Sequence, residues 1–299
     1  MKKIIFISIL ILSLWNTEAR ARNLTLWITE NFNQICLLDK ETLFENGSVA
    51  DILEKNTQVK SDFGGNFITS INGIEINAPE KESWFYYLNG VLSDVGAKQC
   101  VPESGSIIWW DFHSWDNNVY INAVIGAYPQ PFLNGIEGNL KTVILYAASV
   151  EKKAGILKKS LEEKGVREVD IELCRRVSCA REAMFIIMGK WRDLSEFEFV
   201  KDIFKNYRRL NIFVGMEENK LGIMDTSFNV IEEFEKASVI TAVKIGFGKT
   251  RKIIWFITGT DDKSVNEAVD VLLYEPSKIK FYSAAVIHEG EILNAPFLP

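Results

Sequence analysis

The pattern of apolar residues changes near the middle of this 299-residue chain, and that change limits the fold more than any other feature. Before residue 117, short segments alternate apolar and polar side chains, as strands with one buried face do. After residue 140, apolar strands alternate with amphipathic helices. Residues 118–139 follow neither pattern, and prolines and glycines interrupt them. We therefore expect two domains, at residues 22–117 and 140–299, joined by a linker at residues 118–139.

The first domain is predicted to be rich in strands. One short helix is expected at residues 48–55, where Ser48 precedes an apolar pattern as a helix cap does. A hairpin, one helix and then further strands is the order of a β-grasp fold, in which a sheet cradles a single helix. We therefore predict an α+β, β-grasp-like domain at residues 22–117. The expected strands are residues 24–29, 34–38, 67–71, 83–88 and 106–115.

The second domain is predicted to alternate strands and helices. This alternation is typical of a parallel sheet with helices packed on both faces. We therefore predict an α/β three-layer sandwich with a mostly parallel sheet at residues 140–299. The expected strands are residues 142–147, 169–173, 183–188, 212–214 and 253–258. The expected helices are residues 151–164, 195–209, 228–237 and 263–273.

The N-terminal residues have the pattern of a secretory signal peptide. Lys2 and Lys3 precede an apolar run at residues 4–15, and Ala19-Arg20-Ala21 has the form of a cleavage site. The run is shorter than the stretch of about 20 residues that crosses a bilayer. An uncleaved N-terminal anchor is the alternative. We expect residues 1–21 to be removed, no membrane span in the mature chain, and a secreted or extracytoplasmic protein, such as one at the cell surface.

Charge is distributed unevenly between the two predicted domains. Residues 22–139 carry a net charge of −9, whereas residues 140–299 carry a net charge of +1. Nucleic acids and anionic membranes repel an acidic surface. We therefore do not expect nucleic acid, or an anionic membrane surface, as a partner of the first domain.

Four cysteines occur in the chain, and an even number in an exported protein permits two disulfides. Pairing within each domain would join Cys36 to Cys100 and Cys174 to Cys179. Zinc binding is disfavoured, because the chain has only two histidines, His113 and His288, and neither has a ligand spacing from a cysteine pair. Disulfides or free buried thiols are the expected states, with the Cys174–Cys179 bridge the better supported of the two.

Aromatic residues gather in two of the predicted strands. Eight of them lie within the eleven residues 84–87 and 109–115. Trp and Tyr are enriched where one end of a side chain is shielded from water and the other end is hydrated, as at binding surfaces. Three interpretations remain open: a platform for a ligand, a contact with the second domain or the edge of the sheet, and a protein–protein surface.

Alternation along the last aromatic strand divides its side chains between two faces. Residues 108, 110 and 112 form an apolar face, whereas Trp109, Asp111 and His113 share a mixed face. His113 can form a histidine–carboxylate pair with Asp111, or else donate a hydrogen bond to a ligand or coordinate its metal. If the rings form a platform, the candidate ligand-binding residues are Trp84, Tyr86, Tyr87, Trp109, His113 and Trp115.

Motifs for catalysis are missing from the sequence. It has no G-x-S-x-G segment, no H-E-x-x-H segment and no cysteine with a plausible catalytic histidine. Acidic residues are plentiful, but no feature singles out a pair for acid–base chemistry. We therefore predict that the chain is not an enzyme and has neither a metal site nor a permanently bound cofactor.

Several segments resemble the transcobalamin-like C-terminal domain, a small β-grasp-like module that ends the animal cobalamin carriers and occurs alone in exported bacterial proteins. They are residues 24–29, a turn at residues 64–73, the Trp-Phe-Tyr-Tyr-Leu-Asn-Gly run at residues 84–90, and residues 105–115. The resemblance covers about residues 24–116. It implies a β-grasp fold and contact with a corrinoid such as cobalamin. The large helical domain of the carriers is missing, and the α/β half stands in its place.

These observations predict an exported, non-catalytic binding protein whose aromatic platform holds a large flat ligand, with a corrinoid as the leading candidate. The alternative is a cell-surface scaffold or protein-interaction module that has a cell-surface protein as its partner and no small-molecule ligand. Exposure of the rings distinguishes the two, because a scaffold that docks its own α/β domain would hide them.

Overall fold

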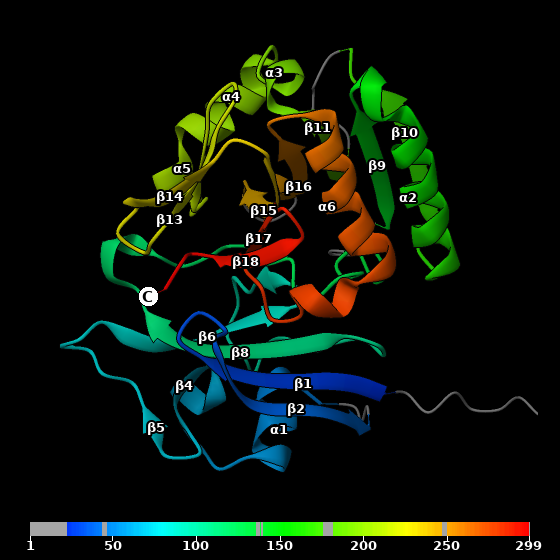
Figure 1. Ribbon diagram of the computed structural model, residues 1–299. Coiled ribbons are helices and arrows are strands. Elements are labelled where there is room, and N and C mark those ends of the chain that lie inside the picture. Colours follow the sequence, from blue (N-terminus) through cyan, green and yellow to red (C-terminus); the bar gives the residue numbers. More distant parts are fainter. Residues whose placement is uncertain are drawn as a thin grey trace, which may run out of the picture.

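The computed structural model describes residues 23–43, 47–135, 138, 140–175, 182–246 and 250–298. The predicted signal peptide at residues 1–21 and the predicted disulfide partner Cys179 lie outside these residues. Two halves are stacked on one another: the N-terminal half forms the lower part of Figure 1 and the C-terminal half the upper part. In the described part of the chain, no helix has the length and apolar character needed to cross a bilayer.

A five-stranded sheet is the centre of the N-terminal half. Its strand order is β2-β1-β8-β6-β7. Strands β1 and β8 run parallel in the middle, and every other neighbouring pair is antiparallel. The hairpin, the helix and the later strands follow one another in the predicted order. The elements are β1 (Asn23–Glu30), β2 (Ile35–Leu43), α1 (Val49–Asn56), β6 (Glu82–Leu88), β7 (Val91–Leu92) and β8 (Ile107–Ser114).

Helix α1 begins as the sequence predicts. Ser48 is its N-cap, and a capping box joins Ser48 to Asp51: the Ser48 hydroxyl accepts from the Asp51 N–H, and the Asp51 carboxylate accepts from the Ser48 N–H. The buried side of α1 packs against one face of the five-stranded sheet. A small sheet of β3 (Val59–Asp62), β4 (Phe67–Ile71) and β5 (Ile74–Glu75) completes this half.

A seven-stranded mixed sheet is the centre of the C-terminal half. Its strand order is β10-β9-β11-β16-β15-β17-β18. The first four strands are parallel, but β15, β17 and β18 are antiparallel to their neighbours, so the prediction of a mostly parallel sheet is wrong. The elements are β9 (Lys141–Tyr146), β10 (Glu168–Leu173), β11 (Met184–Lys190), β15 (Ala237–Ile245), β16 (Lys252–Gly259), β17 (Ala284–His288) and β18 (Glu291–Ala295).

The connection between β15 and β16 explains the antiparallel pairing. Strand β15 ends at Ile245 and β16 begins at Lys252, and so short a connection cannot carry the chain back to start a parallel strand. Gly246 has φ of +75°, and a side chain there would press on the backbone of Thr250. The local sequence therefore favours a hairpin, and the hairpin reverses the strand direction.

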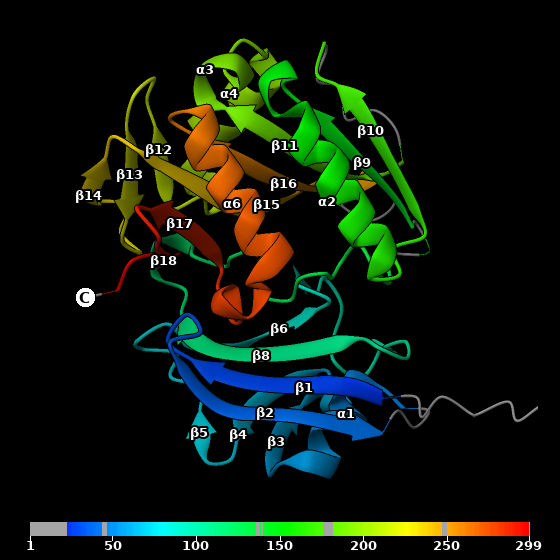
Figure 2. The same cartoon turned by 45° about the vertical axis from the view of Figure 1, so that its right-hand side comes forward.

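Helices cover both faces of the mixed sheet, as Figures 1 and 2 show. Helices α2 (Glu151–Glu163) and α6 (Asp262–Tyr274) pack on one face. On the other face lie α3 (Trp191–Leu194), α4 (Glu198–Lys205), α5 (Tyr207–Leu210) and a small sheet of β12 (Val214–Met216), β13 (Leu221–Met224) and β14 (Val230–Phe234).

Two predicted helices differ from the structure on that second face. Residues 228–237 were predicted to be helical, but they contain β14, whose Val230 and Ile231 are β-branched residues that suit a strand paired with β13. The helix predicted at residues 195–209 is divided into α4 and α5 at Asn206. There the Asn206 side chain donates to the Asp202 carbonyl, 2.7 Å away, and competes with the helical pattern.

The connecting segment after residue 117 packs tightly between the halves. Val119, Ile121 and Val124 are buried in a cluster that contains residues of both halves. The Gly126 N–H donates to the Tyr282 carbonyl at 2.8 Å. A side chain at Gly126 would lie 2.5 Å from backbone atoms of residues 281 and 282, so glycine permits this close approach. Residues 118–135 are therefore an irregular but buried joint.

Candidate functional site

Three aromatic side chains of the N-terminal sheet lie on its helix face, the side that packs against α1. These are Trp84, Tyr86 and Trp110, and all three are buried in one cluster with Leu26 and Leu53. The Trp84 Nε1–H donates to the Ile74 carbonyl at 3.1 Å, and the Tyr86 hydroxyl donates to the Val95 carbonyl at 2.5 Å. Burial raises the pKa of Tyr86 well above its usual value. These rings form the core beside α1.

The opposite side of the same sheet, the domain face, packs against the C-terminal half. Trp27, Tyr87 and Trp109 are buried there, and Phe281 of the other half contacts two of their rings. The ring centroids of Trp27 and Phe281 are 4.9 Å apart, and those of Trp109 and Phe281 are 5.9 Å apart. The Trp109 Nε1–H donates to Thr29 Oγ1 at 2.8 Å. The domain face is therefore an internal interface.

His113 also lies on the domain face, between two aromatic rings. Phe32 and Phe85 stack on its opposite sides with centroid distances of 4.5 Å and 4.4 Å. Its Nδ1 is 2.6 Å from the Asp111 carboxylate, so the histidine–carboxylate pair expected from the sequence is present. Both side chains are almost completely buried, and His113 Nε2 has no hydrogen-bond partner among the described residues.

Hydrogen bonds extend from this pair across the interface between the halves. Asp111 accepts from the Thr29 hydroxyl at 2.6 Å and from the Asn33 N–H at 3.1 Å. The Asn33 side chain in turn donates to Ser283 Oγ at 3.0 Å. Since Ser283 belongs to the C-terminal half, these buried hydrogen bonds join the two halves. Within this network of described residues, His113 Nε2 alone has no partner.

The six predicted ligand-binding residues are divided among three places. Trp84 and Tyr86 lie on the helix face, whereas Tyr87, Trp109 and His113 lie on the domain face. Trp115 is half-buried beyond the end of β8, where its ring stacks on Tyr120 with a centroid distance of 6.5 Å. The structure therefore does not place these side chains on one exposed platform. Burial of Tyr87, Trp109 and His113 against the C-terminal half is instead the outcome expected of rings that dock the protein's own α/β domain.

The predicted Cys36–Cys100 disulfide is wrong, because both thiols are free. Cys36 is exposed on the edge strand β2. Cys100 contacts the side chain of Tyr86, whose strand β6 is three strands away from β2 in the sheet. Neighbouring strands are about 4.8 Å apart, so the two backbones are far beyond the reach of a disulfide. Cys174 is also free; burial raises its pKa to about 11, and its predicted partner Cys179 lies outside the described residues.

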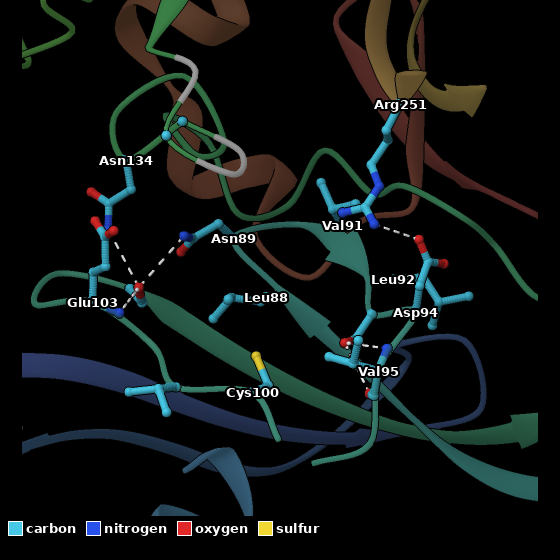
Figure 3. A pocket seen from close by; sticks show the side chains of 15 residues that line it. Leu88, Asn89, Val91, Leu92, Asp94, Val95, Cys100, Glu103, Asn134 and Arg251 are labelled. Carbon is cyan, nitrogen blue, oxygen red and sulfur yellow. Dashed lines mark hydrogen bonds and ion pairs between the residues drawn. The ribbon is translucent and has the colours of Figure 1, made fainter. Parts of the chain in front are cut away.

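A different site lies at the junction of the two halves, and we call it the junction cleft. It has a volume of about 290 Å³. Figure 3 shows amide and carboxyl side chains at one end and an ion pair at the other, with apolar side chains between them. The principal lining residues are Leu88, Asn89, Val91, Leu92, Asp94, Val95, Cys100, Val101, Glu103, Ser106, Asn134 and Arg251.

An ion cluster closes one end of the junction cleft. The Asp94 carboxylate accepts from Arg251 and from Lys244, each at 2.6 Å. Lys244 also donates to the Leu92 carbonyl at 2.8 Å. Burial lowers the pKa of Lys244, and the hydrogen bond that Lys244 donates to the Asp94 carboxylate opposes that change. Asp94 belongs to the N-terminal half and both cations belong to the C-terminal half. The shape of this end of the cleft therefore depends on how the two halves are positioned.

Uncharged polar side chains gather at the other end of the cleft. Asn89 Oδ1 accepts from the Ile107 N–H at 2.9 Å, and Asn134 Nδ2 donates to Ser106 Oγ at 3.4 Å. Glu103 is exposed beside them. Amide and hydroxyl groups of this kind can recognise amides or hydroxyls of a ligand. Among the described residues, no group of three or more His, Cys, Asp and Glu side chains is arranged to hold a metal ion.

Sequence reasoning missed the junction cleft. Its residues come from separate parts of the chain, and Asp94 meets Arg251 only in the folded protein. One signal was present: Asn89, a polar residue at the end of the aromatic run at residues 84–90, lines the cleft.

Comparison with known families gives one match. Residues 46–114 match the family described as Domain of unknown function (DUF4430). This match covers less than half of the chain, and it lies wholly within the N-terminal half. No curated protein matches the chain.

Among the solved structures that resemble part of this chain, two show how weak the likeness is. A protein from Ruminococcus gnavus ATCC 29149, described as a metal-binding candidate, is 16% identical, with a TM-score of 0.28, over 31% of this chain and 96% of that one. Haptocorrin in complex with Cbi is 19% identical, with a TM-score of 0.26, over 31% of this chain and 25% of that one. Both TM-scores are too low to carry an argument about function, and the chain corresponds to only a quarter of haptocorrin.

Proposed function

We propose that this chain is an exported, non-catalytic binding protein whose ligand enters the junction cleft. The position of the cleft supports this proposal most directly. The aromatic run at residues 84–90, which carries the resemblance to the cobalamin carriers, ends in the cleft at Leu88 and Asn89. Arg251 of the C-terminal half closes the opposite end. Export rests on the signal-peptide pattern at residues 1–21.

The size and lining of the cleft indicate what it can hold. Ligand pockets commonly measure about 300–1,000 Å³, so this one is at the lower end of that range. It can enclose a small ligand or one substituent of a larger one. Apolar side chains next to an end that carries two amide side chains, Asn89 and Asn134, suit an apolar body that bears amide groups. A corrinoid, a flat ring with peripheral amides, is the ligand class to test first, with only its edge in the cleft.

In this proposal the predicted aromatic residues position the cleft and do not contact the ligand. The Tyr86 hydroxyl accepts from Ser93 Oγ at 2.5 Å and donates to the Val95 carbonyl, and both of those residues line the cleft. Trp109 and His113 hold the N-terminal sheet against the C-terminal half, whose Arg251 completes the cleft.

Calorimetric titration with cobalamin and with cobinamide tests the proposal. Val95 is 49% exposed and lines the cleft, so Val95→Trp should obstruct the cleft without unfolding the protein. Val230 on β14 is equally exposed and distant in the fold, so Val230→Trp is the matched control. We expect heat of binding from the wild type and from Val230→Trp, and none from Val95→Trp. Binding that Val95→Trp leaves intact would show that the ligand does not use the cleft.

A cell-surface scaffold that binds a protein partner is the second candidate. The observation that favours it is strand β2, an edge of the five-stranded sheet on which Ile35, Leu37 and Leu43 are exposed. An exposed edge strand with apolar side chains can pair with a strand of another chain. The absence of heat with both corrinoids would remove the corrinoid proposal and leave the scaffold as the leading function.

A further inference from the structure

Four charged side chains of alternating sign lie along one flank of α4. They are Glu198, Lys201, Asp202 and Lys205, and all four are exposed. Residues spaced by three and four positions lie on one side of a helix, so these charges form a single stripe. Among the described residues, none of the four takes part in an ion pair with another side chain. The stripe is therefore available to a partner.

An apolar groove runs beside this stripe. It has a volume of about 560 Å³ and lies between α3, α4 and α5 on one side and β12 and β13 on the other. Trp191, Tyr207 and Met216 line it and are only half-buried, while Phe204 and Met224 are buried beneath them. The four charged residues also line the groove. An apolar centre with a charged rim is the usual composition of a protein–protein interface.

The order of the charges matches a second copy of the same helix. When two copies of α4 lie antiparallel about a twofold axis between residues 201 and 202, Glu198 faces Lys205 of the other copy. In the same arrangement Lys201 faces Asp202 of the other copy. Every facing pair then has opposite charges, and each contact occurs twice because a twofold interface repeats it. A parallel arrangement in register would instead place each charge beside an identical one.

We propose that the flank of α4 and the adjoining groove form a self-complementary interface, and that a second copy of this chain occupies it. The charged stripe sets the antiparallel orientation, and the exposed parts of Trp191, Tyr207 and Met216 supply the apolar area that association covers. The interface is on the C-terminal half and uses none of the residues of the junction cleft.

Sedimentation equilibrium of the purified chain over a range of protein concentrations tests this interface. We expect the wild type to form a dimer, and added salt to weaken it because the rim is charged. Lys201→Glu places two like-charged pairs in the interface and should raise the dissociation constant about tenfold or more. The double substitution Lys201→Glu with Asp202→Lys reverses both partners and should restore association. Lys152→Glu, on the exposed side of α2, is the control and should dimerise as the wild type does.

Three outcomes would overturn the proposal. A wild type that stays monomeric at every concentration shows that no such dimer forms. A Lys201→Glu variant that associates as strongly as the wild type shows that any dimer uses another surface. A double variant that stays as weak as Lys201→Glu contradicts the antiparallel pairing.

Discussion

The two faces of the five-stranded sheet carry similar aromatic residues but pack against different parts of the protein. Trp109 and Trp110 are neighbours in β8, and both are buried, with 0% and 2% exposure. Trp110 lies in the cluster beside α1, whereas Trp109 lies in the cluster shared with the C-terminal half. Successive residues of a strand point to opposite faces, so one step along β8 separates two cores.

The polar residues on the domain face explain why its sequence pattern resembles that of an exposed surface. Thr29, Asp111 and His113 would be costly in a core if they had no partners. Here Asp111 accepts from Thr29 and Asn33 and pairs with His113, and the network continues to Ser283. A mixed face can therefore be internal when nearly all of its polar groups have partners, as they do here apart from His113 Nε2.

The largest expected effect comes from removing a ring from either face. Trp109→Ala and Trp110→Ala should each lower the free energy of unfolding by about 3–5 kcal/mol, the usual result of deleting a large buried ring. Chemical denaturation measures the loss. The faces should differ in protease sensitivity: Trp109→Ala should expose the joint at residues 118–135, and Trp110→Ala should loosen α1.

The half-buried Trp115 is the control for these two substitutions. Trp115→Ala should change the free energy of unfolding by less than about 1 kcal/mol, because its ring is already partly in water. A Trp109→Ala variant with unchanged stability would contradict the description of the domain face as a core.

A smaller effect is expected from the buried carboxylate of the domain face. Asp111→Ala removes the acceptor for Thr29 and Asn33 and leaves His113 without its partner. Buried groups left without partners cost about 1–3 kcal/mol, so we expect a destabilisation of about 3 kcal/mol in thermal or chemical unfolding. Asp116→Ala, which breaks the exposed ion pair with Lys81, should cost less than about 1 kcal/mol. Equal losses from the two substitutions would mean that the buried network adds nothing to stability.

The smallest expected effect belongs to the helix face, at the cap of α1. Ser48→Ala should lower the free energy of unfolding by about 1 kcal/mol, because the Asp51 N–H loses its acceptor. A hydrogen bond from Lys98, and then those from Ser48, hold the pKa of Asp51 well below its usual value. A carboxyl group whose pKa is lowered by folding stabilises the folded state at pH values above its usual pKa. This stabilisation is lost as the pH falls through the lowered pKa.

Unfolding measured at neutral and at acidic pH tests the cap further. The difference between wild type and Ser48→Ala should shrink in acid, because Asp51 then no longer contributes as a carboxylate. A difference that stays constant over this pH range would show that Asp51 and Ser48 act independently.

Local patterns in the sequence predicted the elements whose causes are local. The Ser48 cap, the strand alternation at residues 106–115 and the helices at α2 and α6 all depend on residues within a few positions of one another. Where local preferences conflicted, the predictions failed. Residues 228–237 have an apolar spacing compatible with a helix, but pairing with β13 makes a strand.

Only the tertiary structure decided what the aromatic residues and the cysteines do. The burial of Trp109 depends on Phe281, and the junction cleft depends on Asp94 meeting Lys244 and Arg251. Each of these contacts joins residues more than a hundred positions apart, and no local pattern records them. The sequence determined which side chains share a face of the sheet. What covers that face was decided by the packing of the second half, because burial is a property of the whole fold.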